Sequence, residues 1–547
     1  MPAAGLGDGG AQPAGGRRGG DALRIGLAQT DARIGDFDGN RRRMAAAAAE
    51  ARARGAELVV FPELAVTGYP PRDLLLDRAF VDRAVAATAE LARELAGGPP
   101  AVVGTVARSG RSTPGHPGLW NAAALLDGGR VSFLAPKRLL PSYDVFHETR
   151  WFVPGERSEP IAVGGRRIGL LVCEDVWDEA YPIHPPAELL AAGAEILVAI
   201  SSSPFRAGIL ERRLHHARRP GVPLVYVNAA GANDELIFDG GSFVLDGDGR
   251  VLALLPRFEE AVEVVEVGGP HPPAPSPAPP FTPSPGEGET YGALVCGVRG
   301  FVGKNGIGRV FLGLSGGVDS ALVACIAAEA VGAEAVTALA MPSRFTDPRS
   351  TESAREMAAN LGIGFEVVPI EPLHAAFEGA LADLGDKGTT DENLQARLRS
   401  VVLNAWVNSR GGLLLNTSNK TEISLGYGTL HGDLAGTLSV LGDVTKPEVY
   451  AMARWYVANR GPIPGFILDR PPTAELRPGQ VDPFDYPVVA PAVEALVRGQ
   501  APGRDADRWR RMLRASESKR WQHGVILKVS ERAFGTGRMV PITRVES

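Results

Sequence analysis

The chain has 547 residues, more than one hydrophobic core can hold, so its length predicts about three or four domains, or two large α/β ones. Its net charge of −6 is mildly acidic and gives no sign of a nucleic-acid or membrane partner. Three cysteines argue against a disulfide framework, and no run approaches the ~18–20 apolar residues of a membrane span. The first residues lack the apolar core of a signal peptide. We therefore expect a cytoplasmic protein with neither nucleic-acid nor membrane partners.

Residues 1–20 are rich in Gly, Ala and Pro, and we expect a disordered extension there. Strand-like and helix-like runs then alternate up to residue 267. Strands are predicted at 23–29, 57–61, 101–106, 121–126, 131–134, 167–172, 195–200, 224–228, 251–254 and 261–267, and helices at 40–54, 82–95 and 187–192. This alternation predicts one layered α/β domain at 21–267, with sheets covered by helices.

Three reactive side chains stand just after apolar strands in this half: Glu63, Lys137 and Cys173. Strand ends are where α/β folds place their chemistry. A Cys173 thiolate can attack an acyl carbon, while Glu63 takes its proton and passes it to a leaving amine. Lys137 can stabilise the oxyanion and lower the pKa of the thiol. Each residue alone also has an ordinary explanation, as a core cysteine, a helix first-turn acid or a surface lysine.

The contexts of these residues, Phe-Pro-Glu-Leu at Glu63, Leu-Pro-Ser-Tyr after Lys137 and Val-Cys-Glu-Asp-Val-Trp at Cys173, resemble the nitrilase/amidase superfamily. The resemblance covers about residues 23–267 and implies an α-β-β-α sandwich with a Glu-Lys-Cys catalytic set. It also implies that Glu148 orients the lysine. The residues it implies for binding the amide substrate, glutamine, are Tyr143, Glu174, Ser203 and Arg206.

Residues 268–288 are dense in proline. Such a stretch favours extended polyproline geometry and acts as a semi-rigid spacer. We expect it to separate the first domain from a second at 289–547.

The second half opens on a strand, a polar loop and a helix start. An apolar strand at 310–314 leads into Ser315, Gly316, Gly317, Val318, Asp319 and Ser320, and an Ala-rich helix runs on to about residue 331. Unpaired N–H groups at a helix N-terminus attract anions, and paired glycines let a phosphate approach the backbone. Asp319 would repel that phosphate unless a divalent cation lies between them, so it implies Mg²⁺. The Gly-Lys-Ser/Thr ending of a Walker loop is absent.

Further strands are predicted at 335–341, 365–370 and 413–416, and helices at 292–305, 350–361 and 391–408. The alternation predicts a doubly wound, Rossmann-like parallel sheet with the polar loop on its first strand.

The loop resembles the signature of ATP pyrophosphatases, which split ATP into AMP and pyrophosphate, and implies their adenine nucleotide α-hydrolase-like fold. Residues 341–344, 392–397, 416–422, 431–433 and 473–480 resemble NAD synthetase motifs. Together the two halves resemble the glutamine-dependent NAD synthetase family over nearly the whole chain. The resemblance implies a ligase whose small-molecule substrates are ATP, deamido-NAD⁺ and glutamine, with Mg²⁺ as cofactor, in a homo-oligomer.

The same resemblance implies roles for single residues. Mg²⁺ on the ATP phosphates would be shared by Asp319 and Glu422. Gln395 and Arg397 would lie on one helix near the meeting point of ATP and the carboxylate substrate. ATP would be bound by Ser315, Gly316, Gly317, Val318, Asp319, Ser320, Met341, Arg397, Thr417 and Lys446, and deamido-NAD⁺ by Asn393, Lys420, Glu422 and Asp433.

The sequence departs from the family in two places: Phe-Thr-Asp stands at 345–347 where relatives often have Tyr-Ser-Ser, and the lid text at 482–487 is altered. Two alternatives stay open. One is another pyrophosphate-loop amidotransferase ligase acting on a different carboxylate. The other is a non-catalytic binding protein built on two inactive enzyme folds, against which the intact Glu63, Lys137, Cys173 and loop argue.

Overall fold

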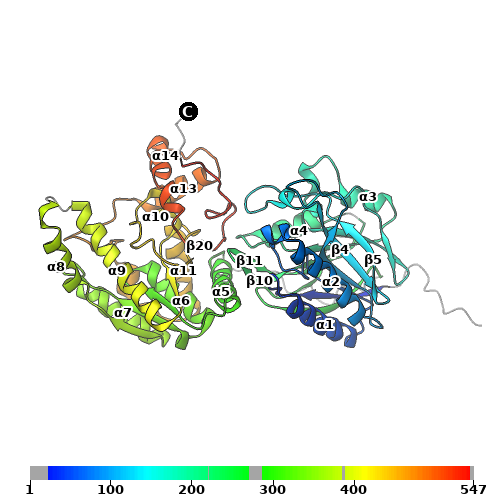
Figure 1. Cartoon of the computed structure of the whole chain (residues 1–547), viewed down its shortest axis with the longest axis horizontal. Coiled ribbons are helices and arrows are strands. Elements are labelled where there is room, and N and C mark those ends of the chain that lie inside the picture. Colours follow the sequence, from blue (N-terminus) through cyan, green and yellow to red (C-terminus); the bar gives the residue numbers. More distant parts are fainter. Residues whose placement is uncertain (1–21, 220, 270–285, 385–387, 543–547) are drawn as a thin grey trace, which may run out of the picture.

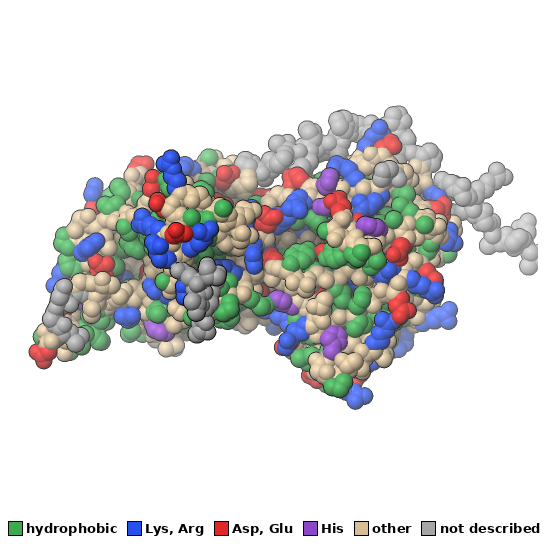
Figure 2. Space-filling model, turned by 90° about the horizontal axis from the view of Figure 1, so that it is seen from above, with side chains coloured by type: hydrophobic (Ala, Val, Ile, Leu, Met, Phe, Trp, Pro, Cys, Tyr) green, Lys and Arg blue, Asp and Glu red, His purple; other side chains and the backbone are tan. Residues whose placement is uncertain are grey.

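The computed structural model describes residues 22–219, 221–269, 286–384 and 388–542. The expected extension at 1–20 and most of the expected spacer, 270–285, lie outside the described residues. Two α/β lobes stand side by side (Figure 1). Acidic and basic side chains are interspersed over the face seen in Figure 2, in keeping with the mild net charge. No helix of the described ranges combines the length and apolar character that crossing a bilayer requires.

The first lobe contains two six-stranded sheets. In order across the first sheet lie β14 (Ala261–Val267), β1 (Leu23–Gln29), β2 (Leu58–Val60), β3 (Ala101–Arg108), β4 (Leu119–Asp127) and β5 (Arg130–Pro136). Across the second lie β13 (Val251–Leu254), β12 (Phe243–Leu245), β9 (Leu224–Asn228), β8 (Ile196–Ser201), β7 (Arg166–Val172) and β6 (Ile161–Val163). Helices α1 (Phe37–Ala53) and α2 (Arg78–Glu94) cover the first sheet, and α3 (Pro185–Ala191) and α4 (Ile209–Ala217) the second.

The two sheets pack face to face through alternating apolar side chains, such as Ile25 and Leu27 of β1 against Ile168 and Leu170 of β7. Separate apolar layers seal each sheet to its own helices. The predicted α-β-β-α sandwich is therefore confirmed.

The second lobe is built on a six-stranded parallel sheet. Its order is β17 (Gly364–Val367), β16 (Val336–Ala340), β15 (Val310–Gly313), β18 (Leu413–Asn416), β19 (Leu438–Ser439) and β20 (Val525–Ile526). Its helices are α6 (Val318–Val331), α7 (Pro348–Leu361), α8 (Glu371–Ala380), α9 (Gly388–Arg410), α10 (Lys420–Leu425), α11 (Lys446–Asn459), α12 (Gly465–Asp469), α13 (Tyr486–Val497), α14 (Ala506–Ala515) and α15 (Glu517–Arg520). The predicted parallel sheet is confirmed, with the loop between β15 and α6.

Helix α5 (Gly286–Lys304) joins the lobes. It begins six residues before the helix expected at 292–305, so residues 286–288 of the expected spacer are helical. Gly300 lies against the hairpin of β10 (Ala230–Asn233) and β11 (Leu236–Asp239), where an added Cβ would come within 2.8 Å of the Ala232 Cβ. At the helix end, the Lys304 ammonium donates to the Ala232 carbonyl at 2.8 Å. The second lobe's first helix is thus anchored on the first lobe (Figure 1).

Candidate functional site

Cys173 lies at the end of β7, on a sharp turn where its φ is +47°. The Val172 amide donates to the Asp175 carboxylate at 3.0 Å, which ties the turn to the strand that precedes it. The Cys173 thiol is buried, and the Ser201 hydroxyl donates to its Sγ at 3.2 Å. Burial and the nearby Glu63 charge raise the pKa of the thiol well above its usual value. Cys173 therefore rests as a thiol and needs a base to become a nucleophile.

Glu63 is the residue expected to act as that base. It follows β2 and is 2% exposed. One of its carboxylate oxygens accepts from Asn121 Nδ2 at 2.7 Å and from Lys137 Nζ at 2.8 Å. The other accepts from the Ser202 amide at 2.8 Å. Three donors thus hold the carboxylate in one orientation beside the thiol's loop.

Lys137 follows β5, is buried, and donates to two carboxylates, Glu63 at 2.8 Å and Glu148 at 2.9 Å. Burial works to lower the pKa of this ammonium, but Glu148 and Glu63 outweigh it and raise that pKa well above its usual value. Burial raises the pKa of Glu148 in turn. The Tyr69 hydroxyl donates to Glu148 at 3.1 Å. Sequence reasoning missed Tyr69, because nothing local marks a tyrosine as facing a carboxylate from 79 residues away.

A cavity of about 760 Å³ opens beside Cys173 and is lined by all four predicted substrate residues, Tyr143, Glu174, Ser203 and Arg206. The Tyr143 hydroxyl donates to the Glu174 carboxylate at 3.1 Å, and Tyr181 donates to it at 2.8 Å. The second lobe closes the cavity with side chains that the sequence did not indicate, among them Arg498, Lys528, Glu531 and Arg532. The cavity lining thus carries both acids and several cations, which complement the opposite charges of a zwitterionic amino acid.

The polar loop between β15 and α6 faces a second cavity, which Ser315, Gly317, Val318, Asp319 and Ser320 line. Inside the loop the Ser315 amide donates to the Ser320 hydroxyl at 3.2 Å, which shapes the turn. Gly316 does not line this cavity. Its φ is +77°, and an added Cβ would lie 2.4 Å from the Ser350 carbonyl oxygen. We infer that the missing side chain of Gly316 allows close packing against α7. At Gly317 the missing side chain leaves the loop backbone open to a ligand in the cavity.

These two glycines make a matched test. We expect Gly316→Ala to destabilise the second lobe by about 1–3 kcal/mol or more, because the new methyl meets main chain in a left-handed conformation. In Gly317→Ala the new methyl meets only side-chain atoms, the Ser315 hydroxyl at 3.3 Å and Arg470 Nη2 at 3.9 Å, so this variant should stay folded while its KM for ATP rises. Thermal unfolding and ATP titration check the pair, and equal melting temperatures would contradict this division of roles.

Asp319 and Glu422 share one ammonium, that of Lys446, at 2.5 and 3.0 Å. All three line the cavity below the loop. Burial raises the pKa of Glu422 to about 7, against the influence of Lys446. Two carboxylates that converge on one cation beside an anion-binding loop provide the oxygen ligands that Mg²⁺ prefers, so these residues fit the expected metal.

A third cavity adjoins the one below the polar loop. The two share Ser315, Thr417 and Asp433, and Met341 lines the third alone. Thr417 follows β18 and Met341 follows β16, so they mark the carboxyl ends of the two strands that flank β15 in the sheet. Asp433 accepts from the Thr429 amide at 2.6 Å, and burial raises the pKa of its carboxyl. The structure thus brings these predicted residues together at one sheet edge.

Arg397 does not line either of these two cavities. It lies on α9 but is exposed, and its Nε donates to the Leu430 carbonyl outside the cavity. Arg399 lines the cavity instead and donates to the Met341 carbonyl at 2.9 Å. Two residues are about 200° apart around a helix, so the inner face that holds Gln395 also holds Arg399 and not Arg397.

Lys420 does not line these cavities either. Its ammonium is fully buried away from the nucleotide cavities, where it meets Glu494 at 2.7 Å and Asp443 at 3.2 Å. These pairs hold α10 to its neighbours. Asn393 also lies outside the residues that line the two cavities, and it accepts from the Thr429 hydroxyl at 2.7 Å.

Comparisons with known proteins cover both lobes. The carbon-nitrogen hydrolase family matches residues 24–268, and the NAD synthase family matches residues 290–497. Glutamine-dependent NAD(+) synthetases from Synechocystis and Rhodobacter capsulatus are 38% and 40% identical, each over 95% of this chain and 98% of theirs. The solved glutamine-dependent NAD+ synthetase from Acinetobacter baumannii superposes with a TM-score of 0.75 at 32% identity, covering 95% of this chain and 98% of that one. This chain belongs to the glutamine-dependent NAD(+) synthetase family.

Proposed function

We propose that this chain makes NAD⁺ by ATP-dependent amidation of deamido-NAD⁺, with glutamine as the nitrogen donor and with AMP, pyrophosphate and glutamate as products. The observation that carries the proposal is the presence, in one chain, of a buried Cys-Glu-Lys set and of a pyrophosphate loop above an acid pair. The relatives' names and their coverage of both lobes support it.

In the first lobe, glutamine binds with its amino-acid end between Glu174 and Arg206. Glu63 takes the Cys173 proton as the thiol attacks the side-chain amide, and then gives the proton to the leaving nitrogen. Lys137 stabilises the oxyanion that forms. Ammonia and a thioester result, and Glu63 activates the water that releases glutamate.

In the second lobe, the loop 315–320 and Lys446 hold the ATP phosphates, and Asp433 contacts the dinucleotide. The nicotinate carboxylate attacks the α-phosphorus, pyrophosphate leaves, and ammonia displaces AMP from the adenylate. Mg²⁺, held by Asp319 and Glu422, would neutralise phosphate charge. Lys446 adds a fixed positive charge where the leaving pyrophosphate accumulates negative charge.

Ammonia must reach the adenylate as neutral NH₃, since its conjugate acid has a pKa well above neutrality, much as lysine does. A site that releases NH₃ inside the protein avoids that protonation.

We also propose a homo-oligomer, which the exposed apolar Leu373 and Phe377 of α8 and Val401 of α9 support. A cytoplasmic location is supported by three cysteines that are all free.

Arg399 and Arg397 distinguish the inner from the outer face of α9. Burial lowers the pKa of the Arg399 guanidinium to about 10, which leaves it charged at neutral pH. We expect Arg399→Met to raise the KM for ATP by about tenfold or more, because a charge-assisted hydrogen bond contributes ~1.5–3 kcal/mol. Arg397→Met should leave that KM within about twofold. Initial rates at varied ATP check the pair, and a larger effect at Arg397 would restore the original prediction.

The experiment that tests the function is incubation of the purified chain with deamido-NAD⁺, ATP, Mg²⁺ and glutamine, with NAD⁺ and pyrophosphate followed together. Pyrophosphate release without NAD⁺, restored only by a different acid in an acceptor screen, would indicate another amidotransferase ligase. If neither product forms with glutamine or ammonia, the proposed function is wrong.

A further inference from the structure

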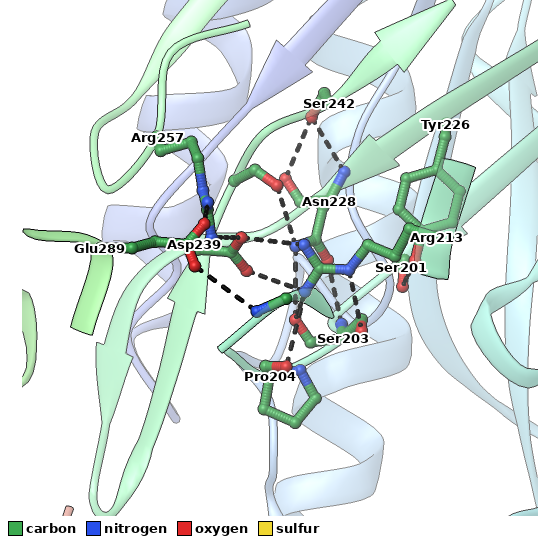
Figure 3. A network of polar contacts seen from close by, with 12 residues as sticks. Ser201, Ser203, Pro204, Arg213, Tyr226, Asn228, Asp239, Ser242, Arg257 and Glu289 are labelled. Carbon is green, nitrogen blue, oxygen red and sulfur yellow. Dashed lines mark hydrogen bonds and ion pairs between the residues drawn. The ribbon is translucent and has the colours of Figure 1, made fainter. Parts of the chain in front are cut away.

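Arg213 of α4 is one of the largest fully buried side chains in the described part of the chain, and the mechanism above does not use it. Removing a guanidinium from water is costly unless its N–H groups find partners. Arg213 finds them in two directions: on the active-site loop that follows β8, and on an acid of β11 (Figure 3).

The loop contacts are specific. Arg213 Nε donates to the Ser203 hydroxyl at 3.1 Å, and Nη2 donates to the Ser203 carbonyl at 2.7 Å. The two residues before Ser203 touch the reacting groups. The Ser201 hydroxyl donates to Cys173 Sγ at 3.2 Å, and the Ser202 amide donates to Glu63 at 2.8 Å. Three consecutive residues thus connect the nucleophile, the base and Arg213.

The counter-charge is equally buried. Asp239 is 0% exposed and receives both Arg213 Nη atoms, at 3.0 and 2.8 Å. Arg257 donates to the same carboxylate at 2.7 Å. Burial works to raise the pKa of Asp239, but the two guanidinium groups outweigh it and hold that pKa below its usual value. Arg257 also pairs with Glu289 of α5, so the network ends on the second lobe's first helix (Figure 3).

A second set of hydrogen bonds, those of Asn228, would hold part of the loop in place without Arg213. The Ser203 amide donates to Asn228 Oδ1 at 2.9 Å, and the Asn228 amide nitrogen Nδ2 donates to the Gly240 carbonyl at 3.1 Å. Loss of the Arg213 contacts would therefore let the loop shift without releasing it. A shift of about 1 Å in a catalytic constellation costs roughly 10²-fold in rate.

We propose that Arg213 and Asp239 are positioning residues of the glutaminase reaction: their bidentate pair holds the loop 201–204 where Ser201 meets the Cys173 thiol and Ser202 meets Glu63. The inference rests on the glutaminase half of the proposed function. The planar guanidinium is essential, because Nε and Nη2 donate to Ser203 of the loop while Nη1 and Nη2 donate to the Asp239 carboxylate. A lysine keeps the charge but offers a single ammonium and cannot reproduce both sets of contacts.

The test uses the full chain with Arg213→Lys and Asp239→Asn, and Arg250→Met as a matched control, because Arg250 is an exposed arginine of the same lobe. We expect kcat for glutamate release from glutamine to fall roughly 10²-fold in both variants, with a much smaller change in KM. NAD⁺ formation from ammonia should match wild type, which shows that the second lobe folds, and a nearly unchanged KM for glutamine shows that the first lobe keeps its substrate cavity. Arg250→Met should match wild type in every assay.

Three results would overturn the inference: unchanged glutamate release, a rise in KM for glutamine with kcat intact, or an equal loss of the glutamine- and ammonia-supported rates, which would indicate a purely structural pair. Glutamate release separates this inference from the proposed function. If wild type hydrolyses glutamine but makes no NAD⁺, the ligase proposal fails and the comparison of variants still decides about Arg213. If wild type hydrolyses no glutamine, both fail.

Discussion

Cys173→Ala is expected to lower glutamine-dependent NAD⁺ formation by about 10⁴-fold or more and to leave ammonia-dependent formation near the wild-type rate. The variant lacks the only sulfur that lies beside Glu63 among the described residues, so no thioester can form. The second lobe loses nothing, because its adenylate reacts with free NH₃ as well. Paired assays with saturating glutamine and with an ammonium salt at alkaline pH measure the effect.

Cys296→Ala is the matched control. Cys296 is a buried thiol of α5, far along the chain from the Glu-Lys pair, and burial raises its pKa to about 12, so it is not a nucleophile at neutral pH. Both nitrogen sources should remain usable in that variant. If Cys173→Ala impaired both activities to the same degree, the assignment of glutamine hydrolysis to the first lobe would be wrong.

Asp319→Asn should produce the reverse pattern. We expect NAD⁺ formation to fall by about 10²–10³-fold with either nitrogen source, the loss typical of removing one preorganised electrostatic group. The amide keeps the hydrogen bond from Asn419 Nδ2, at 2.8 Å, but removes a negative charge from the pair that shares Lys446. Glutamate release from glutamine should persist, because the first lobe keeps all of its own catalytic groups.

The control for this variant is Asp507→Asn, an exposed acid of the same lobe whose partner Arg510 is also on the surface. It should match wild type with both nitrogen sources. Pyrophosphate release and NAD⁺ formation are followed at several Mg²⁺ concentrations. Wild-type pyrophosphate release by Asp319→Asn would mean that this carboxylate does not serve the phosphates.

The sequence located those candidate sites whose residues are consecutive in the chain. The turn that presents Cys173 and the loop 315–320 each lie between a strand and the next helical turn, so short-range periodicity located them. Short elements were missed, among them β6, β19 and β20, because two or three residues carry too little periodicity to identify a strand. Helix α4 was missed as well. Its nine residues include several charged or titratable ones, and one of them, Arg213, lies on the buried face, so the apolar periodicity is interrupted.

The positions of Arg397 and Lys420 outside the nucleotide cavities have separate physical causes. Arg397 and Arg399 are chemically equal in the sequence, and only the packing of α9 on the sheet determines which of them faces the cavity. Lys420 follows a strand end, as Lys137 does, but Asp443 and Glu494 arrive from other helices and loops to neutralise it.

By itself the sequence determined the α/β character of both halves, their longer strands, and the candidate residues Glu63, Lys137, Cys173 and 315–320, because local patterning and contiguous motifs encode them. Only the tertiary structure decided which charges meet: Arg213 with Asp239, Lys446 with Asp319 and Glu422, and the second lobe's cations with the cavity beside Cys173. A buried charge is stable only where partners from distant segments converge on it, and that convergence depends on how layers pack, which no local pattern specifies.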